Sequence, residues 1–119
     1  MIEKVNLAAK FASFDEPWQP KVVAELNDAH VRIAKIEGEF VWHHHDDEDE
    51  LFLVVAGRMR MQFRDGDVVE SGELFVVPRG VEHCPIGEDG CQIVMVEPKT
   101  TLNTGNVRNE RTVDEPERI

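Results

Sequence analysis

Histidine and glutamate residues with the spacing of a metal site lie near the middle of the chain. His43 and His45 are two residues apart, and in a strand this spacing places both imidazoles on one face, about 6–7 Å apart along the chain. Glu50 follows after a short acidic link, from which its carboxylate can turn back toward the same point. His83 is distant in sequence, so only the closure of a barrel would bring it in. Imidazoles and a carboxylate suit a borderline divalent metal.

Two other interpretations of the same residues involve no functional metal. Residues 43–50 could form a solvated polar loop or a histidine cluster that binds nickel or zinc adventitiously, and an isolated histidine such as His83 is often structural. Core-forming strand sequence stands on both sides of the run, with Trp42 before it and Leu51 after it. We therefore favour a site embedded in strands, with His44, of opposite parity, in solvent.

Short strands are the elements expected to position these residues. The clearest spans residues 58–64, where apolar and basic side chains alternate, so one face should be buried and the other exposed. The expected buried set is Met59, Met61 and Phe63, and the expected exposed set is Arg58, Arg60 and Arg64. Other strands are predicted at residues 30–36, 40–43, 51–55, 68–69, 74–77 and 91–96. Turn residues such as Asp65-Gly66 separate them, and this pattern predicts an all-β sandwich or barrel.

Three segments of different character make up the 119 residues, which fit one domain overall. Residues 1–29 form an N-terminal arm, residues 30–98 the barrel, and residues 99–119 a polar C-terminal tail laid over the surface. Within the arm, apolar residues recur on one face of a short helix, at Leu7, Phe11 and Phe14. Asn6 could cap this helix.

Composition and charge exclude several classes of partner. The chain has 24 acidic and 13 basic residues, for a net charge of −11, which opposes binding to nucleic acid and to anionic membrane surfaces. No apolar run approaches the ~20 residues of a transmembrane helix, and no signal-peptide core is visible. We therefore expect a cytoplasmic protein. Cys84 and Cys91 are expected in the core, with a reactive Cys84 beside His83 as the alternative.

Two motifs resemble those of the cupin superfamily, specifically the small single-domain bacterial cupins of the type-2 class. The first family motif is G, five residues, HxH, three or four residues, E, six residues, G, and residues 38–57 follow it with four residues between Gly38 and His43. The second is G, five residues, PxG, two residues, H, three residues, N. Residues 72–87 follow it, except that Gly87 stands at the position of the closing Asn.

This resemblance implies a double-stranded β-helix, which is a jelly-roll form of barrel. It also implies one divalent metal ion, which could be iron, manganese, nickel, zinc or copper, on a defined set of ligands. These ligands are His43, His45, Glu50 and His83. The stretch EPKTTLNTG is similar to the end of small cupins labelled mannose-6-phosphate isomerase-like, a label that we take to describe a fold.

A four-ligand site of this kind leaves open positions on the metal for water, dioxygen or a substrate. Because alternate residues of a strand share a face, Phe52 and Val54 should point inward with Glu50. Another wall of a small apolar pocket is expected from Met59, Met61 and Phe63. Such a pocket suits a small organic ligand with one or two metal-binding oxygens. Two kinds of function need the same pocket. One is an enzyme, which could be a dioxygenase, isomerase, decarboxylase or lyase, and the other is a non-enzymatic sensor or accessory module. The sequence identifies no catalytic acid or base.

The apolar residues of the N-terminal arm raise the question of assembly. Residues 1–29 carry more apolar surface than an unattached arm should expose, so they must pack on the barrel or on a partner. Related small cupins commonly pair, and the resemblance therefore favours a symmetric homodimer.

Overall fold

Two long, bent strands form the centre of the molecule. In the computed structural model, which describes residues 2–66, 68–71 and 74–119, β3 (Glu50–Phe63) pairs with β6 (His83–Pro98) in antiparallel fashion along almost its whole length. Register shifts on both sides of Ala56 bend the pair. The first part of β3 also pairs with β5 and its last part with β4, so this one strand contributes to two regions of the barrel wall.

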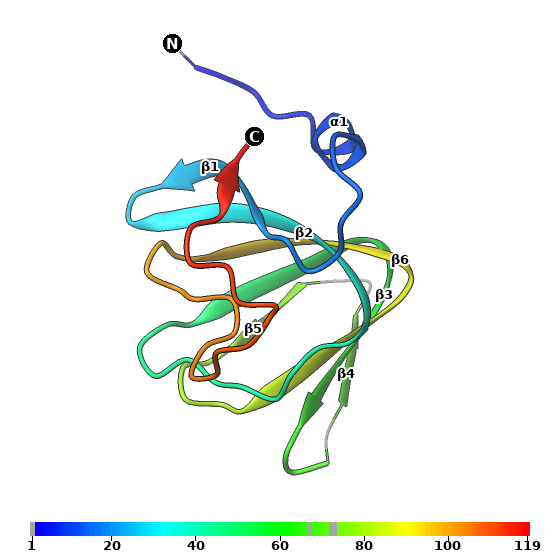
Figure 1. Ribbon diagram of the computed structural model, residues 1–119, viewed down its shortest axis with the longest axis vertical. Coiled ribbons are helices and arrows are strands. Elements are labelled where there is room, and N and C mark those ends of the chain that lie inside the picture. The colour runs from blue at the N-terminus through cyan, green and yellow to red at the C-terminus, as the bar shows by residue number, and fades with distance from the viewer. Residues whose placement is uncertain (1, 67, 72–73) are drawn as a thin grey trace.

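The remaining strands extend the sheet on both sides of this pair. They are β1 (Lys21–Leu26), β2 (Ala29–Glu39), β4 (Val68–Ser71), β5 (Leu74–Val77) and β7 (Glu117–Arg118). The order is β4-β3-β6-β2-β1-β7 with β5 beside β3, and every pairing is antiparallel except that of β1 with β7. Figure 1 shows these strands wrapped around a common interior, with α1 (Leu7–Ala12) outside them. The all-β barrel with a short N-terminal helix is thus confirmed.

Several strand boundaries differ from those predicted. Residues 51–55 and 58–63 belong to the single strand β3, with Arg64 in the following turn, and the predicted strand 91–96 lies in the last part of β6. The Asp89-Gly90 pair, with φ of 57° and 67°, has the residue types of a turn but lies within β6, because a pair with positive φ can be accommodated inside a ladder as a bulge. Residues 40–42 are irregular, and His43 makes only an isolated bridge to His83.

The predicted turns are also adjusted by the structure. Gly66 N donates to Phe63 O at 3.1 Å, so Arg64 and Asp65 are the central residues of that turn in place of the Asp65-Gly66 pair. A turn is also expected from the sequence at Ser71-Gly72, but Gly72 lies outside the described residues.

The alternation predicted for residues 58–64 sets the register of β3. Met59 and Met61 are fully buried, and Phe63 is half-buried against the same core. On the other face, Arg58 and Arg64 are exposed and Arg60 is half-buried. The register is therefore confirmed, since a slip of one residue would have placed the arginines in the core.

Helix α1 covers the outside of the sheet and explains why both faces of β2 are buried. The helix is capped as predicted, because Asn6 Oδ1 accepts a hydrogen bond of 2.9 Å from Ala9 N. Phe11 packs on Ile33 and Val94 of the outer face. The apolar arm is thus covered to a large extent by its own chain, and the homodimer stays a prediction. Among the described residues, no helix is long and apolar enough to cross a membrane.

Candidate metal centre

Four buried side chains converge on one point inside the barrel, and we call them the histidine cluster. They are His43, His45, Glu50 and His83, with exposed fractions of 3, 4, 4 and 1%. One nitrogen or oxygen atom from each lies within 4.8 Å of the corresponding atom of every other. The Glu50 Oε1 atom lies 2.8 Å from His45 Nε2 and 3.4 Å from His83 Nε2. The structure therefore brings together all four residues that the motifs predicted.

Backbone carbonyls orient two of the imidazoles in the same way. His43 Nδ1 donates to Val41 O at 2.9 Å, and His83 Nδ1 donates to Val81 O at 2.8 Å. A neutral imidazole has one N–H, so this contact leaves the Nε2 lone pair directed at the centre of the cluster. Burial, with a smaller effect of His83, lowers the pKa of His43 to about 4, so this ring is neutral at pH 7.

The C-terminal segment holds the loop that carries the first two histidines. His44 N donates to Asn106 Oδ1 at 2.8 Å, and Asn106 N donates back to His44 O at 3.1 Å. Gly105 allows this close approach, because a Cβ atom there would lie 2.2 Å from His44 O. The His44 side chain points away from the cluster, as predicted, and its Nε2 lies 3.0 Å from Asp46 Oδ1 at the surface.

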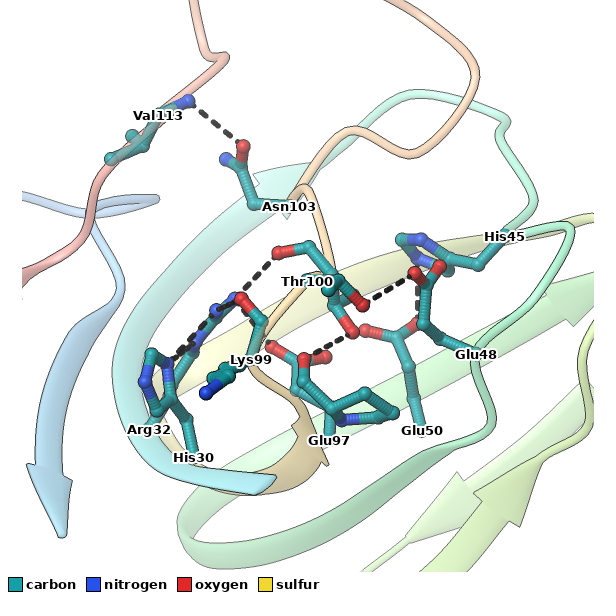
Figure 2. Close-up of polar contacts among 12 residues, drawn as sticks. His30, Arg32, His45, Glu48, Glu50, Glu97, Lys99, Thr100, Asn103 and Val113 are labelled. Atoms are coloured by element: carbon teal, nitrogen blue, oxygen red, sulfur yellow. Dashed lines mark hydrogen bonds and ion pairs between the residues drawn. The ribbon is translucent and has the colours of Figure 1, made fainter. Parts of the chain in front are cut away.

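A second buried group, the arginine cluster, adjoins the first and was not predicted. It consists of Arg32, Glu97 and His30, and Figure 2 shows Arg32, Glu97 and Glu50 in succession. Arg32 Nη1 lies 3.0 Å from Glu97 Oε1, and both side chains are 1–2% exposed. The guanidinium also donates to the carbonyl oxygens of Thr101 at 2.8 Å and Lys99 at 3.1 Å, and it contacts His30 Nδ1.

The two carboxyl groups at the border of these clusters have opposite protonation tendencies. Burial raises the pKa of Glu97 well above its usual value, and the neighbouring Glu50 adds to this effect against the influence of Arg32. Burial alone would also raise the pKa of Glu50, but contacts with Glu97, His45 and His83 hold it well below its usual value. The contact between the two carboxyl groups therefore favours the protonated form of Glu97 and the ionised form of Glu50.

Unpaired atoms in the histidine cluster show that its residues fit a metal ion. His45 Nε2, His83 Nε2 and Glu50 Oε1 are buried and make no aligned hydrogen bond to a described residue. His83 Nδ1 is occupied by Val81 O, and the Nε2 atom faces Glu50 Oε1 3.4 Å away. Each buried polar atom left in this state costs about 1–3 kcal/mol. A cation between them would satisfy all three, and three imidazoles with one carboxylate form a donor set that binds divalent metals.

A cavity opens beside the cluster and provides access to it. Its empty volume is about 510 Å³, including the part open to solvent, and it is lined by His43, Glu50 and His83 together with apolar residues. Phe52 lines it and Val54 is buried in the same core, both on the inward face of β3 as predicted. The predicted wall of Met59, Met61 and Phe63 is wrong: these residues pack in the core and are not among the described residues that line the cavity.

The cysteine thiols take no part in this site. Cys84 and Cys91 are both free and buried, and burial is the main cause that raises the pKa of each to about 11. Both thiols are therefore protonated at neutral pH, which agrees with the expected core role and gives no support to a reactive Cys84.

Comparisons with known proteins agree with this geometry. Residues 29–97 match the family model described as a cupin domain. The uncharacterized protein YdbB of Bacillus subtilis (strain 168) is 40% identical over 85 residues, which are 70% of this chain and 75% of that protein. A cupin-2 domain containing protein from Shewanella frigidimarina NCIMB 400 has a crystal structure with a TM-score of 0.76 at 43% identity, over 80% of this chain and 94% of that one.

A second crystal structure, that of protein NMB1881 from Neisseria meningitidis, matches with a TM-score of 0.74 at 33% identity, over 82% of this chain and 100% of that one. The matched family segment, residues 29–97, is more than half of the chain and contains the whole histidine cluster. The chain therefore belongs to the cupin family.

Proposed function

We propose that the protein binds one divalent metal ion on His43, His45, Glu50 and His83 and presents it to a small organic molecule in the adjoining cavity. The observation that carries this proposal is the set of buried ligand atoms that face one another without hydrogen bonds. A protein has little reason to bury three such atoms together unless a ligand satisfies them. Iron, manganese, nickel, zinc and copper all accept this donor set.

A metal bound at this position would supply a Lewis acid, or a water of lowered pKa, next to the cavity. The residues of the chain would perform the positioning. The contacts of His43 and His83 with Val41 O and Val81 O fix two rings before any ligand arrives, and Glu97 contacts Glu50 from the other side. Preorganisation of this kind reduces the cost of binding.

Metal analysis of the protein purified without an affinity tag tests this function. We expect close to one equivalent of a transition metal, and uptake of one equivalent of Zn²⁺ or Mn²⁺ after treatment with a chelator. His83→Ala and His45→Ala should abolish this uptake, whereas His44→Ala, which alters a side chain outside the cluster, should not. Failure of the unmodified protein to retain or take up any of these metals would contradict the proposal.

A non-enzymatic role, as a ligand-binding sensor or accessory module, is the second candidate. The observation in its favour is that Glu97, the one further carboxyl group lining the cavity among the described residues, is engaged with Arg32 and Glu50. Oxygen uptake and product formation with small acids, diketones and enediols distinguish the two. Turnover would favour the enzyme, and saturable binding without turnover would favour the module.

We further propose that the protein forms a homodimer through the outer face of the sheet. Two rows of aliphatic side chains cross β2, β6, β3 and β5 in register there: Ile33, Val94, Leu53 and Leu74 in one row, and Val31, Val96, Leu51 and Val76 in the other. Helix α1 packs over the β2 and β6 end, whereas Leu74 and Val76 are 58% and 51% exposed. A second copy related by a twofold axis presents the same rows, so aliphatic surface would meet aliphatic surface.

Sedimentation velocity at micromolar concentration tests the dimer. The double substitution of Leu74 and Val76 by Lys should shift the protein to monomer. Leu26→Lys is the matched control, because Leu26 is 61% exposed at the far end of β1 and should leave the dimer intact. A single species of monomer mass for the unmodified chain would contradict the dimer.

A further inference from the structure

The walls of the cavity are almost entirely apolar above the histidine cluster. Six of the residues that form them are Pro20, Ala34, Ile36, Phe52, Ile93 and Met95. None of the described residues that line the cavity is Lys or Arg. A cavity of this kind gives a phosphate or a second anionic group no counter-charge, and it gives an apolar ligand body a continuous contact surface.

The two polar lining residues outside the histidine cluster are already engaged within the protein. Asn103 Oδ1 accepts from Val113 N at 2.8 Å, and its Nδ2 donates to Arg111 O at 2.8 Å; Figure 2 shows the contact with Val113. Glu97 is held by Arg32 at 3.0 Å. A polyhydroxylated ligand would therefore lose its hydrogen bonds to water on entry and regain few of them.

One side of the cavity is formed by two stacked aromatic rings, Trp18 and Phe40, which we call the aromatic wall. The rings of Trp18 and Phe40 are stacked with their centroids 4.5 Å apart and an interplanar angle of 15°. The Phe40 ring in turn lies at 87° to the His43 ring, with 5.5 Å between the centroids. This aromatic wall therefore reaches a member of the histidine cluster.

The backbone holds Trp18 in a conformation that a bulky residue seldom adopts. Its φ is +63°, in the left-handed region, where a large side chain is strained. Two hydrogen bonds fix it there: Trp18 N donates to Lys35 O at 2.9 Å, and Trp18 Nε1 donates to Glu37 O at 3.0 Å. The Arg111 guanidinium lies 5.2 Å from the centre of the Trp18 ring. Local strain maintained by several contacts is typical of residues that shape a functional site.

We propose that the ligand of this cavity is a flat, apolar molecule with a single oxygen-bearing head group, such as an aromatic monocarboxylic acid or a phenol. Its ring lies along the wall of Trp18 and Phe40, and its head group reaches the metal position. Sugars, sugar phosphates and other polyhydroxylated acids are excluded as ligands. This inference rests on the proposed function, since the head group needs the metal, and it makes Trp18 a residue that determines specificity.

Calorimetric titration of the Zn²⁺-loaded protein with three carboxylates of the same head group tests this proposal. The probes are benzoate, which is flat, cyclohexanecarboxylate, which is apolar but not flat, and gluconate, which is polar. We expect benzoate to bind most tightly and gluconate at least tenfold more weakly. Binding of gluconate equal to or tighter than that of benzoate would overturn the ligand class while leaving the metal centre intact.

Variants of the two tryptophans identify the wall itself. Trp18→Gly removes the ring at a backbone conformation that glycine adopts without strain, and it should reduce benzoate affinity about tenfold with no change in Zn²⁺ content. Trp18→Phe keeps an aromatic wall and should retain most of the affinity. Trp42→Leu is the matched control, because the Trp42 ring packs on Arg64 and is not among the described lining residues. Unchanged benzoate affinity in Trp18→Gly would overturn the assignment of the ring position. If the unmodified protein did not take up Zn²⁺, both the ligand proposal and the proposed function would be overturned.

Discussion

Two buried polar clusters lie next to each other inside this barrel, and they differ in how completely the protein satisfies them. In the arginine cluster, the guanidinium of Arg32 has Glu97, His30 and two backbone carbonyls as partners. In the histidine cluster, three buried ligand atoms have no aligned hydrogen bond to a described residue. The contact between Glu97 and Glu50 joins the two clusters.

This difference separates a structural role from a functional one. Burial of a charge is unfavourable unless other groups of the protein compensate it, and the guanidinium of Arg32 is compensated by the fold alone. In the arginine cluster, Glu97 Oε2 is the atom that makes no aligned hydrogen bond to a described residue. The histidine cluster is buried to the same extent, yet three of its ligand atoms have no hydrogen-bond partner among the described residues and stay uncompensated unless a cation is bound. The comparison therefore predicts that damage to the first cluster affects folding and that damage to the second affects metal binding.

The largest expected effect is on folding. Arg32→Met removes the donor that pairs with Glu97 and with the carbonyl oxygens of Lys99 and Thr101. Each buried acceptor left unpaired costs about 1–3 kcal/mol of unfolding free energy, and urea denaturation measures the total. Arg108→Met, at an exposed ion pair with Asp114, should leave the urea midpoint unchanged. A midpoint for Arg32→Met equal to that of the unmodified protein would remove the distinction between the clusters.

Removal of the metal should have a smaller effect that leaves the fold intact. At a free metal concentration of 100 times the dissociation constant, binding stabilises the folded state by about 2.7 kcal/mol, and a chelator removes this contribution. Thermal unfolding with and without chelator should show a lower midpoint without metal, while the β-sheet circular dichroism signal at 25 °C persists. In His83→Ala the chelator should have no effect. Identical midpoints for the unmodified protein in both conditions would argue against a metal on this cluster.

The border residue Glu97 allows a test of how far the two clusters depend on each other. Glu97→Leu removes the hydrogen bond to Glu50, and loss of a group that orients a metal ligand weakens metal binding by about 10–100-fold. Glu97→Gln keeps an N–H donor for Glu50 and an acceptor for Arg32, so it should retain most of the affinity. Competition with a metal-sensitive dye measures both constants. Equal affinities for the two variants would show that the Glu97 contact does not position Glu50.

The sequence was sufficient to locate the histidine cluster but not the groups around it. His43 and His45 are two residues apart and therefore share one face of a strand. The two motifs identified Glu50 and His83 as the other members. Arg32 and Glu97 also have inward parity, next to Ala34 and Met95 respectively, and this parity was the available signal. A charged residue in an alternating strand usually indicates a solvent-exposed face, and only the carbonyls of a distant segment show that Arg32 can be buried.

The same limit applies to the cavity and to the strands. Trp18 stands in an irregular segment, and no periodicity indicates that its ring lies over the cavity. The Asp89-Gly90 pair has the residue types of a hairpin turn, but the pairing of β6 with both β2 and β3 keeps the strand continuous through it. Long-range pairing, which local sequence does not encode, decided each of these cases.

The smallest expected effect concerns the loop that carries His43 and His45. Asn106→Ala removes the acceptor of the His44 backbone N–H, and the loss of one such hydrogen bond costs about 0.5–1.5 kcal/mol. The loop should open more often, so amide hydrogen exchange at His44 should accelerate and the metal should dissociate faster, with little change in global stability. His44→Ala is the matched control, because the backbone contact with Asn106 does not involve the His44 side chain. If both variants exchange and release metal at the rate of the unmodified protein, the C-terminal segment does not hold this loop, and the histidine cluster depends on β3 and β6 alone.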